Sequence, residues 1–205
     1  AACLQQYGVL LSRGGDLPGA RDVLAEVVEI RSAVLGPAAP DTLSTRIDVA
    51  ALLRQAGEFE AALAELDEVD AALAGPEGDA LLGPLAEGRA RVLFDLGRTA
   101  EAEENARFAH ELRVAELGED HPLTLDALNL IGAVRFRAGD LLGAEDAWRT
   151  VYEGYLDLYG ERSLNTIIAS ANLGLVYENQ GRYDEAEPLL RDAVDLSTEV
   201  LGTGH

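Results

Sequence analysis

The sequence has no lysine and no methionine, and its 205 residues include a single cysteine, Cys3. One cysteine excludes an internal disulfide and favours a reducing compartment. The lack of lysine excludes a Walker-type phosphate loop, which needs a lysine before its Ser or Thr. Because no methionine opens the chain, we expect it to be a fragment of a larger protein.

Long apolar runs are also missing. No stretch approaches the roughly 20 apolar residues that cross a bilayer, and no signal peptide opens the chain. All 16 basic residues are arginine, and 37 acidic residues bring the net charge to −21. This charge repels polyanions, so we expect no nucleic acid and no membrane as a partner, and a cytoplasmic location. The 48% of hydrophobic residues is enough for a folded core.

A repeat of about 42 residues dominates what the sequence does contain. A glycine followed five residues later by alanine occurs five times, at spacings of 42, 40, 42 and 42, at Gly15, Gly57, Gly97, Gly139 and Gly181. A second series has the same spacings, at Gly36, Gly78, Gly118, Gly160 and Gly202. Two glycine series with one period indicate a repeated structural unit.

Between the glycines the apolar residues recur at steps of three and four, as in Ala186, Leu189, Leu190 and Ala193. Each unit is therefore predicted to be a short helix, a tight glycine turn and a longer helix ended by the second glycine. The predicted fold is all-α, a single array of five antiparallel helix-turn-helix units. The predicted units are residues 1–40, 41–82, 83–122, 123–164 and 165–205.

Interior positions of the units also repeat. Seven residues before each turn glycine the residue is always glycine or alanine, and five residues after it is always alanine. The residues four further on are predicted to fill the space between neighbouring hairpins: Leu24, Leu66, Ala106, Trp148 and Leu190. The second unit is irregular, because Ala74-Gly75-Pro76 interrupts its long helix. The next short helix is predicted to begin near Gly83 and Pro84.

The segment NLGLVYENQGRYDEAEPLL, residues 172–190, resembles a tetratricopeptide repeat in its small and large positions: Leu173, Gly174, Tyr177, Gly181, Ala186 and Leu190. The 42-residue unit is similar to the long variety of kinesin light chains and of bacterial regulatory ATPases of the NB-ARC or STAND type. The resemblance covers all five units and is weakest in the second and third. It implies a right-handed superhelical solenoid that serves as the scaffold or sensor region of a larger bacterial regulator.

Residues suited to catalysis are few. Glu119, Asp120 and His121 adjoin in LGEDHPLTL, but His205 stands at the equivalent position of the last unit, which indicates a structural role. We interpret this segment as a connector in which Asp120 caps the helix that begins at Pro122. No HExxH and no paired CxxC occurs. We therefore predict no enzymatic activity, no cofactor and no metal site.

Charge is distributed unevenly between the predicted helices. The five short helices carry seven arginines and six acidic residues, whereas the rest of the chain sums to −22. Stacked hairpins present their first helices on a concave side, so we expect a neutral or mildly basic groove that binds an acidic or carboxylate-bearing peptide. By the family's geometry the groove includes Gln6, Arg13, Asp48, Arg54, Arg91, Asn129, Arg137, Asn172 and Asn179. The alternative is that these are ordinary exposed polar residues.

A different function is also compatible with the sequence. Repeat arrays need caps at their ends, and uncapped apolar ends associate. The array is then a self-association or intramolecular autoinhibitory module without an external peptide ligand.

Overall fold

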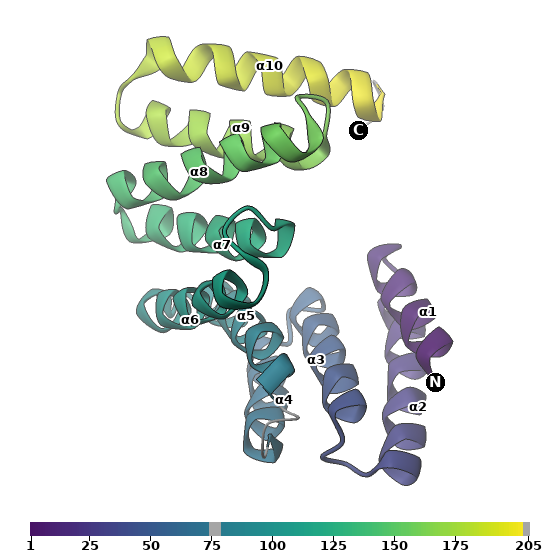
Figure 1. Ribbon diagram of the computed structural model, residues 1–205. Helices are drawn as coiled ribbons and strands as arrows, with labels where there is room; N and C mark the ends of the chain where they lie inside the picture. Colours follow the sequence, from purple (N-terminus) through teal and green to yellow (C-terminus); the bar gives the residue numbers. More distant parts are fainter. Residues whose placement is uncertain (74–78, 203–205) are drawn as a thin grey trace. The chain divides into compact units, whose positions relative to one another are not determined.

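The computed structural model describes residues 1–73 and 79–202, and this part of the chain contains ten α-helices and no strand (Figure 1). The predicted all-α repeat of helical hairpins is confirmed. Hairpins 1 and 2 consist of α1 (Ala2–Arg13) with α2 (Leu17–Leu35) and α3 (Pro40–Gln55) with α4 (Phe59–Ala72). Hairpin 3 consists of α5 (Asp79–Asp95) and α6 (Thr99–Leu117). Hairpins 4 and 5 consist of α7 (Pro122–Ala138) with α8 (Leu141–Tyr159) and α9 (Leu164–Asn179) with α10 (Tyr183–Leu201).

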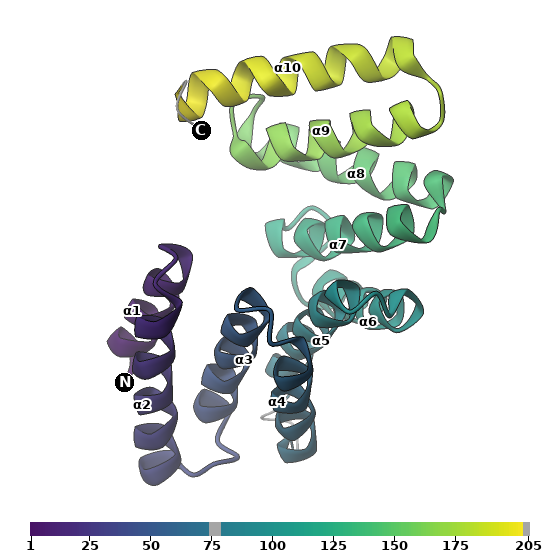
Figure 2. The same cartoon turned by 180° about the vertical axis from the view of Figure 1, so that it is seen from behind.

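Packing divides the chain into two compact units, Ala1–Asn105 and Ala106–His205, with the boundary inside α6. In the first unit α3 packs against α2, α4 and α5. In the second unit the helices α7 to α10 follow one another in chain order, as both views show (Figures 1 and 2). No helix in the described part of the chain is long and apolar enough to span a membrane.

The two glycine series mark the ends of helices, as predicted. Nine of the ten glycines have φ between +74° and +101°, and Gly78 lies outside the described residues. A side chain is strained at such a φ, whereas glycine adopts it freely. No other residue type among the described ones has a positive φ. Glycine is therefore the residue that these turns require.

Hairpins 1, 4 and 5 close by packing a large side chain over a glycine, whereas hairpin 3 has Ala90 and Ala106 at these two positions. A Cβ built on Gly132 would lie 2.6 Å from the Trp148 ring, and one on Gly174 would lie 2.8 Å from Leu190. The large residues thus pack against the first helix of their own hairpin. The sequence analysis missed this contact. Trp148 also packs with Val176 of the next hairpin, as predicted.

The start of hairpin 3 differs from the prediction. The helix α5 begins at Asp79 and runs through Pro84, although we expected it to begin near Gly83 and Pro84. Proline lacks the N–H that would bond to the carbonyl of Ala80, which favours a position in the first turn of a helix. Burial of the neighbouring Leu85 and Ala86 offsets the missing bond. The predicted interruption at residues 74–76 lies outside the described residues.

Two of the connectors between hairpins are fixed by a threonine that the sequence analysis missed. The Thr42 hydroxyl donates to the Gly36 carbonyl at 2.9 Å, and the Thr124 hydroxyl donates to the Gly118 carbonyl at 2.8 Å. The cap of α7 is His121, whose Nδ1 accepts from the Leu123 N–H at 3.2 Å. The prediction that Asp120 caps this helix is wrong, because the residue directly before the proline occupies the N-cap position.

Candidate functional site

Polar side chains link the first helices of consecutive hairpins. Gln5 Nε2 donates to Asp48 Oδ2 at 2.5 Å, and Asn172 Nδ2 donates to Asn129 Oδ1 at 3.3 Å. Two more contacts lie near the turns, where Ser12 Oγ donates to Gln55 Oε1 and Arg54 Nη1 to Asp95 Oδ2, each at 2.8 Å. We call these eight residues the polar ladder. Its contacts join residues 41 or 43 apart, so the repeat itself places them together.

Four of the nine predicted groove residues belong to the polar ladder: Asp48, Arg54, Asn129 and Asn172. The other five lie elsewhere on the first helices. Gln6, Arg13, Arg137 and Asn179 are exposed, and Arg91 is half-buried. The Asn179 amide donates to the Leu175 carbonyl of its own helix at 2.8 Å. Their part in a groove stays a prediction.

The ladder residues that the sequence analysis missed are Gln5, Ser12, Gln55 and Asp95. Each is a polar residue on a first helix, two, three or ten positions before a turn glycine. A search for polar pairs spaced by one repeat would have found them. Spacing within one helix, which guided the prediction, does not show which residues meet across hairpins.

A buried arginine on a second helix hydrogen-bonds to one residue of the polar ladder, Gln5. Arg31 on α2 is only 6% exposed. Its Nη1 donates to Gln5 Oε1 at 2.7 Å, to Thr45 Oγ1 at 2.6 Å and to the Asp41 carbonyl at 2.8 Å. These bonds position Gln5 toward Asp48. The sequence offered no signal for this, because an arginine on a long helix is ordinarily exposed.

Burial raises the pKa of Asp48, although the hydrogen bond from Gln5 and the charge of Arg31 oppose the rise. The folded-state pKa therefore lies above that of the unfolded chain. A carboxyl with a raised pKa loses stabilising free energy as the pH rises through that value. The ionised form of Asp48 is thus less favourable to the fold than its protonated form, although Asp48 keeps its hydrogen bond to Gln5.

Ion pairs neutralise most arginines on the first helices of the first unit. Arg54 is paired with Asp95, and Arg91 Nη2 lies 2.6 Å from Glu87 Oε1. Arg46 and Arg89 are also paired with acidic residues of α4. Arg13 is exposed at the end of α1 and makes no ion pair with residues 1–73 or 79–202. The small positive sum of these helices is therefore largely compensated within the unit.

The described residues offer little for catalysis or metal binding. No group of three or more His, Cys, Asp or Glu side chains among them is placed to hold a metal ion. Cys3 is exposed near the start of α1. What the ladder offers is hydrogen-bond donors and acceptors on preformed helices.

The fold of this chain is similar to that of several solved structures. Solved structures with the same fold include the nearly identical TPR-like repeats of a kinesin light chain from Podosopora anserina, at 18% identity, TM-score 0.74 and coverage of 98% of this chain and 95% of that one. BtubC (BKLC) from P. vanneervenii matches at 16% identity and TM-score 0.71 over 95% of this chain and 74% of that one. MamA matches at 17% identity and TM-score 0.61 over 94% and 95%.

The search of curated proteins returned no match. The family model of the tetratricopeptide repeat, in contrast, matches residues 1–69, 82–155 and 125–199. These segments include all five turn glycines and the first helices that carry the polar ladder. The chain belongs to the tetratricopeptide repeat family.

Proposed function

We propose that this chain is a non-catalytic protein-interaction scaffold whose first helices bind an extended segment of a partner protein. Family membership supports the scaffold role, because tetratricopeptide arrays use the surface of their stacked hairpins for binding. The helices are formed without the partner, so little ordering free energy is lost on binding. Its place within a larger bacterial regulator stays a prediction.

The contact between Asn129 and Asn172 carries this proposal. Both side chains are half-buried, and one hydrogen bond of 3.3 Å joins them. An asparagine amide has two donors and an acceptor with two lone pairs, so this single bond leaves most of their capacity unused. Peptide backbone has the complementary groups at every residue. The pair is suited to hold the main chain of a bound segment.

A carboxylate-bearing segment fits the arginines on the first helices of the first unit. Arg13 is exposed, and arginine binds carboxylates through two parallel hydrogen bonds. Arg54 and Arg91 already hold internal carboxylates, so a partner's carboxylate would exchange with Asp95 or Glu87. We therefore assign main-chain contacts to Asn129 and Asn172 of the second unit and, as a separate contact, carboxylate binding to the arginines of the first unit, foremost Arg13.

We predict that the double variant Asn129→Ala, Asn172→Ala weakens segment binding by about tenfold or more, which corresponds to ~1.4 kcal/mol or more. Peptides are selected on the whole chain from a random display library, and their affinities are measured by fluorescence anisotropy. We expect the selected peptides to contain Asp, Glu or a free carboxyl terminus. Asn165→Ala is the control, because Asn165 is exposed on α9 outside the ladder. Equal affinities for all three proteins would refute the proposal.

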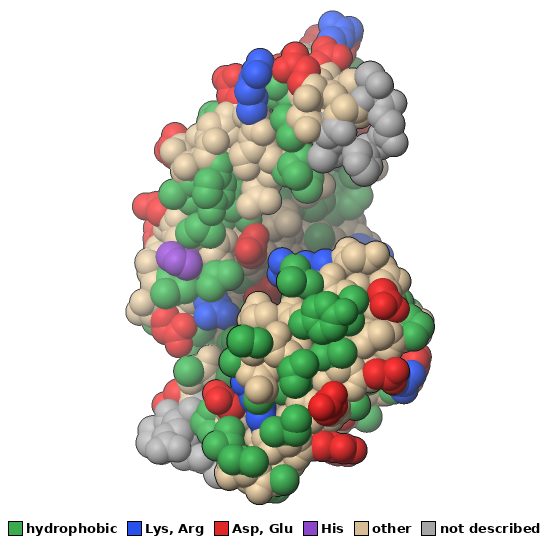
Figure 3. Space-filling model, turned by 90° about the vertical axis from the view of Figure 1, so that its right-hand side faces the viewer, with side chains coloured by type: hydrophobic (Ala, Val, Ile, Leu, Met, Phe, Trp, Pro, Cys, Tyr) green, Lys and Arg blue, Asp and Glu red, His purple; other side chains and the backbone are tan. Residues whose placement is uncertain are grey.

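A second candidate function, self-association, is favoured by apolar side chains on hairpin 1. Figure 3 shows hydrophobic side chains on the face of the first unit that α1 and α2 form. Tyr7, Leu10 and Val34 are 52%, 63% and 74% exposed. Exposed apolar patches of this kind commonly mark interaction sites. We infer that a second copy of the chain covers this surface.

If so, the sedimentation coefficient rises with protein concentration, and the double variant Leu10→Glu, Val34→Glu abolishes the rise because it charges the patch. Leu142→Glu, at a residue 72% exposed on α8, is the matched control and should leave the association unchanged. A wild-type chain that stays monomeric up to about 1 mM, a concentration that detects contacts as weak as ~4 kcal/mol, excludes self-association.

A further inference from the structure

A cleft of about 690 Å³ lies between α2, α3 and α4, apart from the polar ladder. Its lining is mostly apolar and includes Leu17, Val28, Val49 and Leu53. Acidic side chains also line it: Asp22 and Glu29 of α2, Glu58 at the N-cap of α4 and Glu65 of α4. We call it the α2 cleft. A volume of this size accommodates a small ligand or two side chains.

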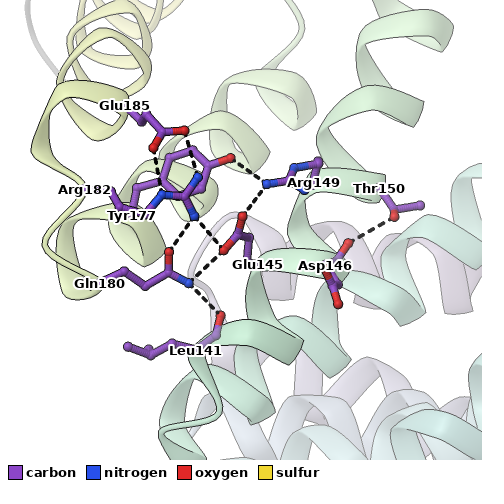
Figure 4. Close-up of polar contacts among 9 residues, drawn as sticks. All are labelled: Leu141, Glu145, Asp146, Arg149, Thr150, Tyr177, Gln180, Arg182 and Glu185. Atoms are coloured by element: carbon purple, nitrogen blue, oxygen red, sulfur yellow. Dashed lines mark hydrogen bonds and ion pairs between the residues drawn. The ribbon is translucent and has the colours of Figure 1, made fainter.

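At the interface of hairpins 4 and 5 the equivalent positions near the turns carry larger aromatic and charged side chains. The turn glycines set the equivalence, because Gly15 and Gly57 correspond to Gly139 and Gly181. The Arg182 guanidinium lies 4.1 Å from the centre of the Tyr177 ring, and its Nη1 donates to Glu145 Oε2 at 2.8 Å (Figure 4). Arg149 Nη2 donates to the Tyr177 hydroxyl at 3.1 Å. An aromatic ring and two guanidinium groups occupy this interface.

At the α2 cleft the repeat has smaller residues at the same positions. Leu53 replaces Tyr177, and Ala25 replaces Arg149. Arg21 and Glu58 stand at the repeat positions of Glu145 and Arg182, with the signs of the two charges exchanged. They also form an ion pair, with Arg21 Nη1 3.3 Å from Glu58 Oε1. These two side chains are 62% and 43% exposed, so they do not fill the space.

The interface between hairpins 2 and 3 shows a related arrangement. Arg89 of α5 is paired with Asp67 and, through Nη1 and Oδ2 at 3.2 Å, with Asp70 of α4. Arg89 stands at the repeat position of Val49 in the α2 cleft. At these two interfaces an arginine of the following hairpin, Arg89 or Arg182, thus meets acidic residues of the preceding one. No arginine of α3 lines the α2 cleft.

We propose that the α2 cleft binds an arginine with a neighbouring aromatic residue from a partner protein. The partner would supply the guanidinium and the ring that the hairpin 4 and 5 interface holds internally. Asp22 and Glu29 make no ion pair within the described part of the chain, so their carboxylates are available to the guanidinium. The ring packs against Val28, Val49 and Leu53, whose burial favours binding. This partner chemistry differs from the carboxylate preference of the polar ladder.

The test uses the peptide acetyl-Gly-Tyr-Arg-Gly-amide, titrated into the ¹⁵N-labelled whole chain and followed by NMR. We expect saturable amide shifts at Ala25, Val28 and Leu53. The double variant Asp22→Arg, Glu29→Arg should lower the affinity at least ~10-fold, because it reverses two charges beside the guanidinium. Ala25→Trp should abolish binding, since a tryptophan at this exposed position fills the cleft. Glu26→Arg, at an exposed residue of the same helix outside the cleft, is the matched control.

The peptide acetyl-Gly-Tyr-Glu-Gly-amide separates charge recognition from apolar contact and should bind at least ~10-fold more weakly. The proposal is overturned by equal binding of the two peptides, by an equal loss in Glu26→Arg, or by an absence of shifts at the cleft. Shifts confined to Asn129 and Asn172 also overturn it, because they place the peptide on the polar ladder. Circular dichroism of each variant confirms that the helices are intact, and the charge-reversal variant remains decisive if Ala25→Trp does not fold.

Discussion

Replacement of Gly132 with alanine is expected to destabilise the unit that contains hairpins 4 and 5. The new Cβ would lie 2.6 Å from Cδ1 and Nε1 of Trp148, and a real contact is never that short. The indole is held in place, because Nε1 donates to the Asn129 carbonyl at 3.2 Å and the ring packs on Phe136 at a centroid distance of 5.5 Å. Overpacking costs about 1–3 kcal/mol, whereas the helix gains only ~1 kcal/mol from alanine.

The measurement is urea unfolding followed by tryptophan fluorescence, since Trp148 is the only tryptophan and reports on this unit. Circular dichroism gives the unfolding of the whole chain. Gly88→Ala is the matched control, because its Cβ would lie at an ordinary 3.4 Å from Leu66. That variant should gain about 0.5–1 kcal/mol. A Gly132→Ala midpoint at or above the wild type would show that the close approach of α7 and α8 is not needed.

Glu145→Gln is expected to weaken the interface of hairpins 4 and 5. Glu145 is 7% exposed and accepts from Gln180 Nε2 and Arg182 Nη1, each at 2.8 Å, and it is paired with Arg149 (Figure 4). The amide keeps the shape but lacks the charge that holds two guanidinium groups. Hydrogen bonds between charged groups contribute about 1.5–3 kcal/mol, so we expect a loss of that order in the free energy of unfolding at pH 7.

The loss should depend on pH. Burial raises the pKa of Glu145, but the hydrogen bonds from Arg182 and Gln180 and the charges of Arg182 and Arg149 outweigh it, so the pKa lies below its usual range. The carboxylate therefore stabilises the fold above the unfolded-state pKa of about 4.3, and this stabilisation disappears as the pH falls through the folded-state value. The difference in the free energy of unfolding between wild type and Glu145→Gln should be largest at pH 7 and disappear in strong acid.

A matched control stands at the same repeat position in hairpin 5. Glu187 is 64% exposed and pairs with Arg191 one turn along α10. Exposed pairs of this kind contribute about 0.3–0.5 kcal/mol. Glu187→Gln should therefore change the unfolding midpoint little. If both variants lose the same free energy, burial gives Glu145 no special role.

The hairpin boundaries could be predicted because they depend on local geometry. A left-handed turn needs glycine wherever it occurs, so Gly15 and Gly139 are recognisable without their surroundings. The start of α5 could not be predicted this way. Packing of Leu85 and Ala86 keeps Pro84 inside a helix, and burial is a property of the folded chain.

The candidate site was predicted only in part for a similar reason. The sequence placed Asn129 and Asn172 on first helices, but their contact depends on the stagger of α7 against α9. Arg31 is the clearest case, because its side chain passes from α2 to both α1 and α3. Its partners are therefore set by the packing of three helices.

The sequence by itself determined the repeat, the all-α hairpins, the glycine turns and the family, because each depends on spacing and on the conformational freedom of single residues. Only the tertiary structure decided which charges meet. Arg21 with Glu58 and Glu145 with Arg182 occupy the same repeat positions with opposite signs, yet one pair is exposed beside a cleft and the other joins a network around the buried Glu145. The side chains around each pair, Leu53 and Ala25 or Tyr177 and Arg149, decide this, because they set how much space remains between the helices.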